Sequence, residues 1–105
     1  MIIVLPACQR ELLSFPDDIR GDLADALARL DGGLLLSMPL SRPMPIIGTR
    51  VHELRLKDQS GNYRMFYVLP GGNVVYVLHA FKKKTQSTPK PNIALARKRL
   101  KELSS

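Results

Sequence analysis

Three strand-like segments joined by two short turns constrain the fold of this chain most strongly. The segment VHELRLKD at residues 51–58 alternates apolar and polar side chains, and YRMFYVL at residues 63–69 is rich in aromatic and β-branched types. The segment VVYVLHAF at residues 74–81 has almost no polar positions, which is typical of a strand covered on both faces. The turn sequences QSGN and PGGN separate these segments. The pattern therefore predicts an antiparallel three-stranded meander.

Apolar side chains at helical spacing predict helices before and after the meander. A short helix fits residues 7–15, a longer one fits residues 17–30, and a last one fits residues 89–103. We expect Ser14 to cap the longer helix and Thr88 to cap the last one, because a proline follows each at a first-turn position. The apolar faces of these two helices consist of Ile19, Leu23, Ala26, Leu27 and Leu30, and of Ile93, Ala96, Leu100 and Leu103.

The remaining segments complete the expected architecture. Residues 2–5 form a short apolar run that fits an edge strand, and residues 34–49 contain three prolines and are expected to be an irregular connection. We expect an α/β (α+β) fold with helices packed on a small antiparallel sheet. A chain of 105 residues is long enough for one domain and too short for two, so we expect a single domain over residues 1–105.

Composition restricts the class of protein. Cys8 is the single cysteine in the sequence, which excludes an internal disulfide and favours a cytoplasmic protein. No apolar run approaches the roughly 18 residues that a membrane span requires. We therefore expect no association with a membrane.

Charge is distributed unevenly along the chain. Residues 1–49 hold four Lys/Arg and six Asp/Glu, a net charge of −2, whereas residues 50–105 hold twelve Lys/Arg and three Asp/Glu, a net charge of +9. A surface with one dominant sign of charge indicates an anionic partner, of which nucleic acid is the commonest. A basic surface that serves solubility alone is the other interpretation.

Several of these cations are expected to lie together in a meander. Arg55 and Lys57 point the same way from the first strand, Arg64 begins the second, and Lys82–Lys84 follow the third. In an up-and-down sheet, the end of the third strand lies beside the end of the first and the start of the second. The sequence therefore predicts a cationic site for a phosphodiester at one end of the sheet.

The residues available limit the chemistry at such a site. There is no glycine-rich phosphate loop, the carboxylates of the basic half are scattered, and two histidines make a poor metal site. We therefore expect no metal and no cofactor. RNA carries its own nucleophile in the 2′-hydroxyl, so that cleavage needs only its orientation and the stabilisation of charge on the phosphorane.

Each candidate residue also has a structural interpretation. Arg55 and Arg64 can pair with carboxylates such as Glu53, and the lysine run can be a solvated strand end. His79 can be a core histidine or an acid–base group. The general base stays open between His79 and Lys57.

The second half of the chain resembles a known superfamily. The motifs are ELR at residues 53–55, YRMFY at residues 63–67, LHAFKKKTQSTP at residues 78–89 and ARKRLKEL at residues 96–103. In this order and spacing they resemble the phage-derived, HigB-like branch of the RelE/ParE toxin superfamily. The resemblance implies a RelE-like α/β fold and a toxin that cleaves messenger RNA, usually on the ribosome, without metal. It also implies a cognate antitoxin, often a helix-turn-helix protein.

The resemblance further implies roles for individual residues. Arg55, Arg64 and Lys83 fall on catalytic basic positions, with His79 as an acid–base candidate. The RNA-binding positions are Lys57, Lys82, Lys84, Thr85 and Gln86. Two other functions stay open: a ParE-like inhibitor of DNA gyrase, and a basic nucleic-acid-binding domain without catalysis.

Overall fold

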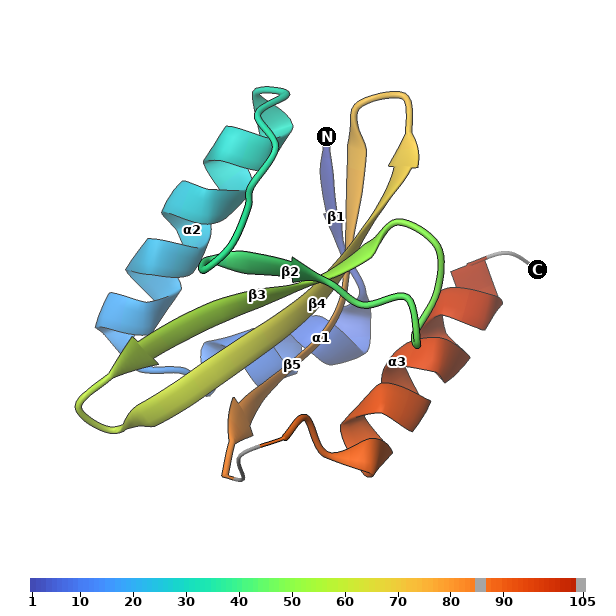
Figure 1. Cartoon of the computed structure of the whole chain (residues 1–105). Coiled ribbons are helices and arrows are strands. Elements are labelled where there is room, and N and C mark those ends of the chain that lie inside the picture. Colours follow the sequence, from blue (N-terminus) through green and yellow to red (C-terminus); the bar gives the residue numbers. More distant parts are fainter. Residues whose placement is uncertain (85–86, 104–105) are drawn as a thin grey trace.

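The computed structural model describes residues 1–84 and 87–103, which form one five-stranded sheet and three helices (Figure 1). The strand order is β1-β5-β4-β3-β2, so the predicted meander β3-β4-β5 occupies the middle of the sheet. This architecture confirms the expected α/β fold class. In chain order the elements are β1 (Ile2–Val4), α1 (Pro6–Leu13), α2 (Asp17–Asp31), β2 (Ser41–Pro43), β3 (Val51–Asp58), β4 (Gly61–Gly71), β5 (Val74–Lys83) and α3 (Lys90–Leu103).

Tight turns connect the strands of the meander. Between β4 and β5, Gly72 and Asn73 have φ angles of 66° and 61°, which are the left-handed values that a two-residue hairpin requires. At the β3–β4 hairpin, the Asp58 carboxylate accepts hydrogen bonds from the backbone N–H and the hydroxyl of Ser60. Both turns lie where the sequence predicted them.

The two outer strands are short. β1 pairs with β5 in parallel, which confirms the expected edge strand and makes the sheet mixed rather than fully antiparallel. β2 pairs antiparallel with β3, so the expectation of an entirely irregular connection over residues 34–49 was wrong at Ser41–Pro43. Pro43 is tolerated there because β2 is an edge strand, where a missing N–H costs no ladder hydrogen bond.

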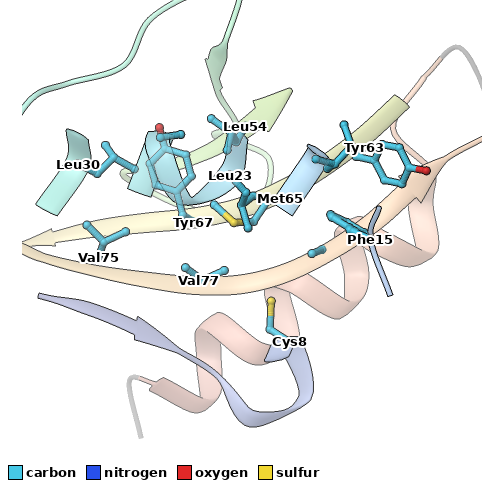
Figure 2. Packing of buried hydrophobic residues seen from close by; sticks show 13 residues of the cluster. Cys8, Phe15, Leu23, Leu30, Leu54, Tyr63, Met65, Tyr67, Val75 and Val77 are labelled. Atoms are coloured by element: carbon cyan, nitrogen blue, oxygen red, sulfur yellow. The ribbon is translucent and has the colours of Figure 1, made fainter. Parts of the chain in front are cut away.

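Helices cover both faces of the sheet. α1 and α2 pack on one face, where Phe15, Tyr63 and Tyr67 contribute aromatic rings to the core (Figure 2). α3 packs on the other face against Phe66 and Phe81, and the predicted apolar stripe of this helix faces the sheet. The first cluster is built around Cys8, Phe15, Ile19, Leu23, Leu30, Leu54, Met65, Val75 and Val77, and the second around Met44, Ile47, Val51, Val68, Leu78 and Ala96.

Neither expected helix cap forms. Ser14 ends α1, where its hydroxyl donates to the Glu11 carbonyl at 2.6 Å, and α2 begins after Pro16 without a side-chain cap. Thr88 donates instead to the Glu53 carboxylate, which lies on β3. Among the described residues, no helix has both the length and the apolar character needed to cross a bilayer.

Candidate active site

The strand register brings three of the predicted site residues together. Arg55 on β3 lies directly opposite Arg64 on β4, and the next β4 position on the same face, Asn62, lies opposite Lys83 on β5. Side chains two residues apart share a face of a strand. Arg55, Arg64 and Lys83 therefore lie on the face that carries α3, at the end of the sheet near the β3–β4 hairpin.

The carboxylate of Glu53 lies at the centre of this group and is fully buried. Its Oε1 atom accepts a hydrogen bond from Arg42 Nη2 at 2.9 Å and lies 3.8 Å from Arg64 Nε and 4.0 Å from Arg55 Nε. Its Oε2 atom accepts from Thr88 Oγ1 at 2.9 Å. The group thus draws on β2, β3, β4 and the segment before α3.

Positive charge exceeds negative charge here. We define the cationic cluster as Arg42, Arg55, Arg64 and Lys83; within the part of the chain that the structure describes, these four cations surround the single carboxylate of Glu53, which leaves a net charge of +3. In the same part of the chain, the Nε atoms of all three arginines are buried and have no hydrogen-bond acceptor. The excess of positive charge suits the cluster to an added anion.

Lys83 has an unusual electrostatic environment. Partial burial and then the positive charge of Arg64 lower the pKa of the Lys83 ammonium, and Glu53 opposes this only in part. Burial likewise lowers the pKa of Arg64, with Arg55 and Arg42 acting in the same direction. A lysine with a lowered pKa is better suited to proton transfer than an ordinary surface lysine.

The other predicted lysines lie in different places. Lys82 points to the opposite face of the sheet, where its Nζ atom lies 5.8 Å from the centre of the Tyr63 ring. Lys84 is exposed just after β5. Lys57 is exposed on the face of Arg55 and lines a groove of about 410 Å³ together with Arg55, Asn62 and Arg64. Thr85 and Gln86 lie outside the described residues.

His79 lies in a separate, buried network. Its Nδ1 atom is 3.0 Å from Glu11 Oε1, and its Nε2 atom is 2.6 Å from Asn92 Oδ1. Arg99 binds Glu11 Oε1 at 2.8 Å and the Leu78 carbonyl at 2.9 Å. Because both ring nitrogens of His79 already face protein oxygens, the geometry favours the structural interpretation of this histidine over an acid–base role.

Two members of the site escaped the sequence analysis. Arg42 lies on β2, a strand that the surrounding prolines concealed, and Thr88 was assigned to a helix cap. For Glu53, pairing with Arg55 and Arg64 was expected as an alternative to their role in phosphate binding, and the structure allows both at once. Among residues 1–84 and 87–103, no group of three or more His, Cys, Asp or Glu side chains is placed to hold a metal ion.

Comparisons with known proteins agree with this architecture. The fold is similar to that of the isolated E. coli RelE toxin in its P21 crystal form, with a TM-score of 0.57 and 16% sequence identity over 98% of this chain and 97% of that one. No curated protein sequence matches the chain. The sequence model of the family described as "Phage derived protein Gp49-like (DUF891)" matches residues 10–101. The chain therefore belongs to the phage-derived Gp49-like family, a family of RelE/ParE-like toxins, and has the RelE fold.

Proposed function

We propose that this chain is the toxin of a toxin–antitoxin system and that it cleaves messenger RNA at the cationic cluster without a metal ion. The observation that carries the proposal is the surplus of positive charge around Glu53, where Arg42, Arg55, Arg64 and Lys83 share one carboxylate among the described residues. A phosphodiester group supplies the missing negative charge where Arg42 and Arg55 are partly exposed. Membership of a RelE/ParE-like toxin family supports the same function.

The proposed reaction uses the nucleophile that RNA provides. The 2′-oxygen attacks the adjacent phosphorus, the bond from phosphorus to the 5′-oxygen breaks, and the products are a 2′,3′-cyclic phosphate and a free 5′-hydroxyl. The guanidinium groups of Arg55 and Arg64 stabilise the extra charge on the phosphorane. Lys83, as an ammonium with a lowered pKa, donates a proton to the departing 5′-oxygen. The group that accepts the proton of the 2′-hydroxyl stays open between His79 and Lys57.

The finer features of the proposal follow from the resemblance to HigB-like toxins. We infer that cleavage takes place on the translating ribosome in the cytoplasm, and that a helix-turn-helix antitoxin neutralises the protein. Lys57 and Lys84 then contact the RNA backbone beside the cluster, because both are exposed near the same end of the sheet.

The decisive experiment maps RNA ends on ribosomes programmed with a defined message. We expect cuts within codons that persist in EDTA, disappear in Arg64→Ala and remain in Arg29→Ala. Arg29 is a matched control because it is an exposed arginine on α2, on the other side of the sheet. Inhibition of gyrase without RNA cleavage, or salt-sensitive RNA binding with neither activity, would contradict the proposal.

A further inference from the structure

We propose that Glu53 is a positioning residue, whose buried carboxylate orients the arginines of three strands so that the exposed parts of Arg42 and Arg55 meet the phosphate. This inference rests on the proposed cleavage of RNA and assigns a role to a residue that is fully enclosed by protein. Because Glu53 is shielded, it cannot itself contact the substrate and must act through its neighbours.

The distances from Glu53 show how its carboxylate orients the three arginines without hydrogen-bonding to every guanidinium group. Arg42 donates to Glu53 through Nη2 at 2.9 Å, so its own Nε atom is not consumed. Arg55 and Arg64 approach Glu53 with their Nε atoms at 4.0 and 3.8 Å, which is close enough for strong attraction and too far for a hydrogen bond. Each guanidinium is therefore held in place, while the side chains of Arg42 and Arg55 stay partly exposed to a ligand.

Repulsion within the cluster makes such a counterion necessary. Arg55 and Arg64 occupy directly opposite positions on neighbouring strands, an arrangement in which like charges destabilise a sheet. Lys83 adds a third positive charge on the same face. Without the carboxylate, the two guanidinium groups would separate and turn toward solvent, and the reacting phosphate would lose its preorganised donors.

Glu53 also binds Thr88, which lies two residues before α3. Its second oxygen accepts from Thr88 Oγ1 at 2.9 Å, and Arg42 Nη2 lies 3.4 Å from the same hydroxyl. Thr88 is thereby attached to the centre of the cluster. This contact gives the inference a second variant, since Thr88→Val retains the side-chain shape and removes the hydrogen bond.

The first test compares Glu53→Gln with Glu11→Gln, the equivalent change in the His79 network. For Glu53→Gln we expect kcat for RNA cleavage to fall by about 30-fold or more with KM unchanged or lower, because preorganised donors are lost while positive charge is gained. The pH–rate limb due to Lys83 should move to lower pH, since Glu53 raises the pKa of Lys83. For Glu11→Gln we expect a lower Tm with kcat, KM and the pH profile of the folded protein unchanged.

Thr88→Val provides a test in which no charge is changed, since threonine and valine are both neutral. Thr88 is also only partly buried. We expect a smaller loss of kcat, about 3- to 10-fold, together with a lower Tm, because one oxygen of the buried Glu53 carboxylate loses its hydrogen bond. Wild-type values of kcat and pH profile in both Glu53→Gln and Thr88→Val would overturn the inference. If Glu53→Gln does not fold, an unchanged kcat in Thr88→Val alone would overturn the inference.

A second readout separates this inference from the proposed function. In ¹⁵N NMR spectra, we expect the Nε–H signals of Arg42, Arg55 and Arg64 to be separate and to shift on addition of inorganic phosphate, and to merge toward the free-arginine position in Glu53→Gln. If the wild-type protein cleaves no RNA but shows this difference, the proposed function fails and the role of Glu53 stands. If these signals are the same in both proteins, Glu53 does not position the arginines.

Discussion

Two carboxylates on neighbouring parts of the molecule, Glu11 and Glu53, each gather positively charged or polar side chains, but they do so differently. Glu11 binds Arg99 through both oxygens, contacts His79 and accepts the backbone N–H of Ala80. The groups of Arg99, His79 and Ala80 that face Glu11 are therefore all hydrogen-bonded to it. Glu53 has more cations around it than one carboxylate can bind, and donors on those cations remain without acceptors in the described part of the chain.

The difference separates a structural network from a candidate binding site. A closed network holds elements together, and in this protein it joins α1, β5 and α3. A network with surplus positive charge carries a repulsive cost that an anionic ligand can remove. Burial alone does not distinguish the Glu11 network from the Glu53 network, since both contain buried side chains. The balance of positive and negative charge distinguishes them.

The largest expected effect is the loss of RNA cleavage when an arginine beside Glu53 is removed. Arg64→Ala should lower the rate of RNA cleavage by about 100- to 1,000-fold, as expected when one preorganised donor to the transition state is removed. Single-turnover cleavage at saturating protein measures this rate. Arg99→Ala is the matched change in the other network, and a comparable loss of rate in that variant would remove the distinction between the two.

Neighbouring lysines should differ by the face on which they lie. Lys83→Ala should slow cleavage by about 10- to 100-fold, within the range for loss of a general acid. Lys82→Ala should leave cleavage within about twofold of wild type, because an exposed side chain on the opposite face does not reach the phosphate. Both variants should retain the wild-type Tm. Equal losses would show that the RNA contacts both faces.

Substitutions in the Glu11 network should lower the stability of the protein and leave the rate of RNA cleavage unchanged. His79→Gln or Arg99→Ala should lower the free energy of unfolding by about 1–3 kcal/mol, because each leaves a partner in the network without its hydrogen bond. Urea denaturation followed by circular dichroism gives this value. A large loss of kcat at unchanged stability in His79→Gln would restore the acid–base role that the sequence left open.

The smallest effect concerns pH. Burial raises the pKa of Glu11, but hydrogen bonds from Arg99, His79 and Ala80 outweigh it and bring the pKa below its ordinary value of 4.5. The stabilisation is therefore complete above pH 4.5 and is lost as the pH falls through the lower, folded-state pKa. Tm measured between pH 7 and pH 3 should decrease less in Glu11→Gln than in wild type. Parallel curves would show that other groups account for the decrease.

Local patterns predicted the meander, because alternation and turn residues act over a few positions. The convergence of Arg55, Arg64 and Lys83 at one end of the sheet followed from topology alone. The opposite directions of Lys82 and Lys83 were also available from the two-residue period of a strand, had β5 been extended through Lys83. The lysine run was instead treated as the segment beyond the strand.

Other parts of the site depend on contacts that sequence spacing does not reveal. Arg42 reaches Glu53 because β2 pairs with β3 across a connection rich in prolines, and nothing local in SRP indicates a strand. Thr88 has the sequence of a helix cap and bonds a residue 35 positions away instead. Both outcomes are tertiary effects that override local preference.

The edges of the sheet limit how a partner protein can bind. β1 and β2 are each three residues long, and Pro43 removes a donor from β2. Beyond β1, the side chains of Glu11 and Arg99 occupy the Ala80 N–H and the Leu78 carbonyl of β5. A partner that docks by strand addition needs a long row of free backbone groups. The antitoxin that we propose for this protein is therefore expected to recognise side-chain surfaces and helices rather than to extend the sheet.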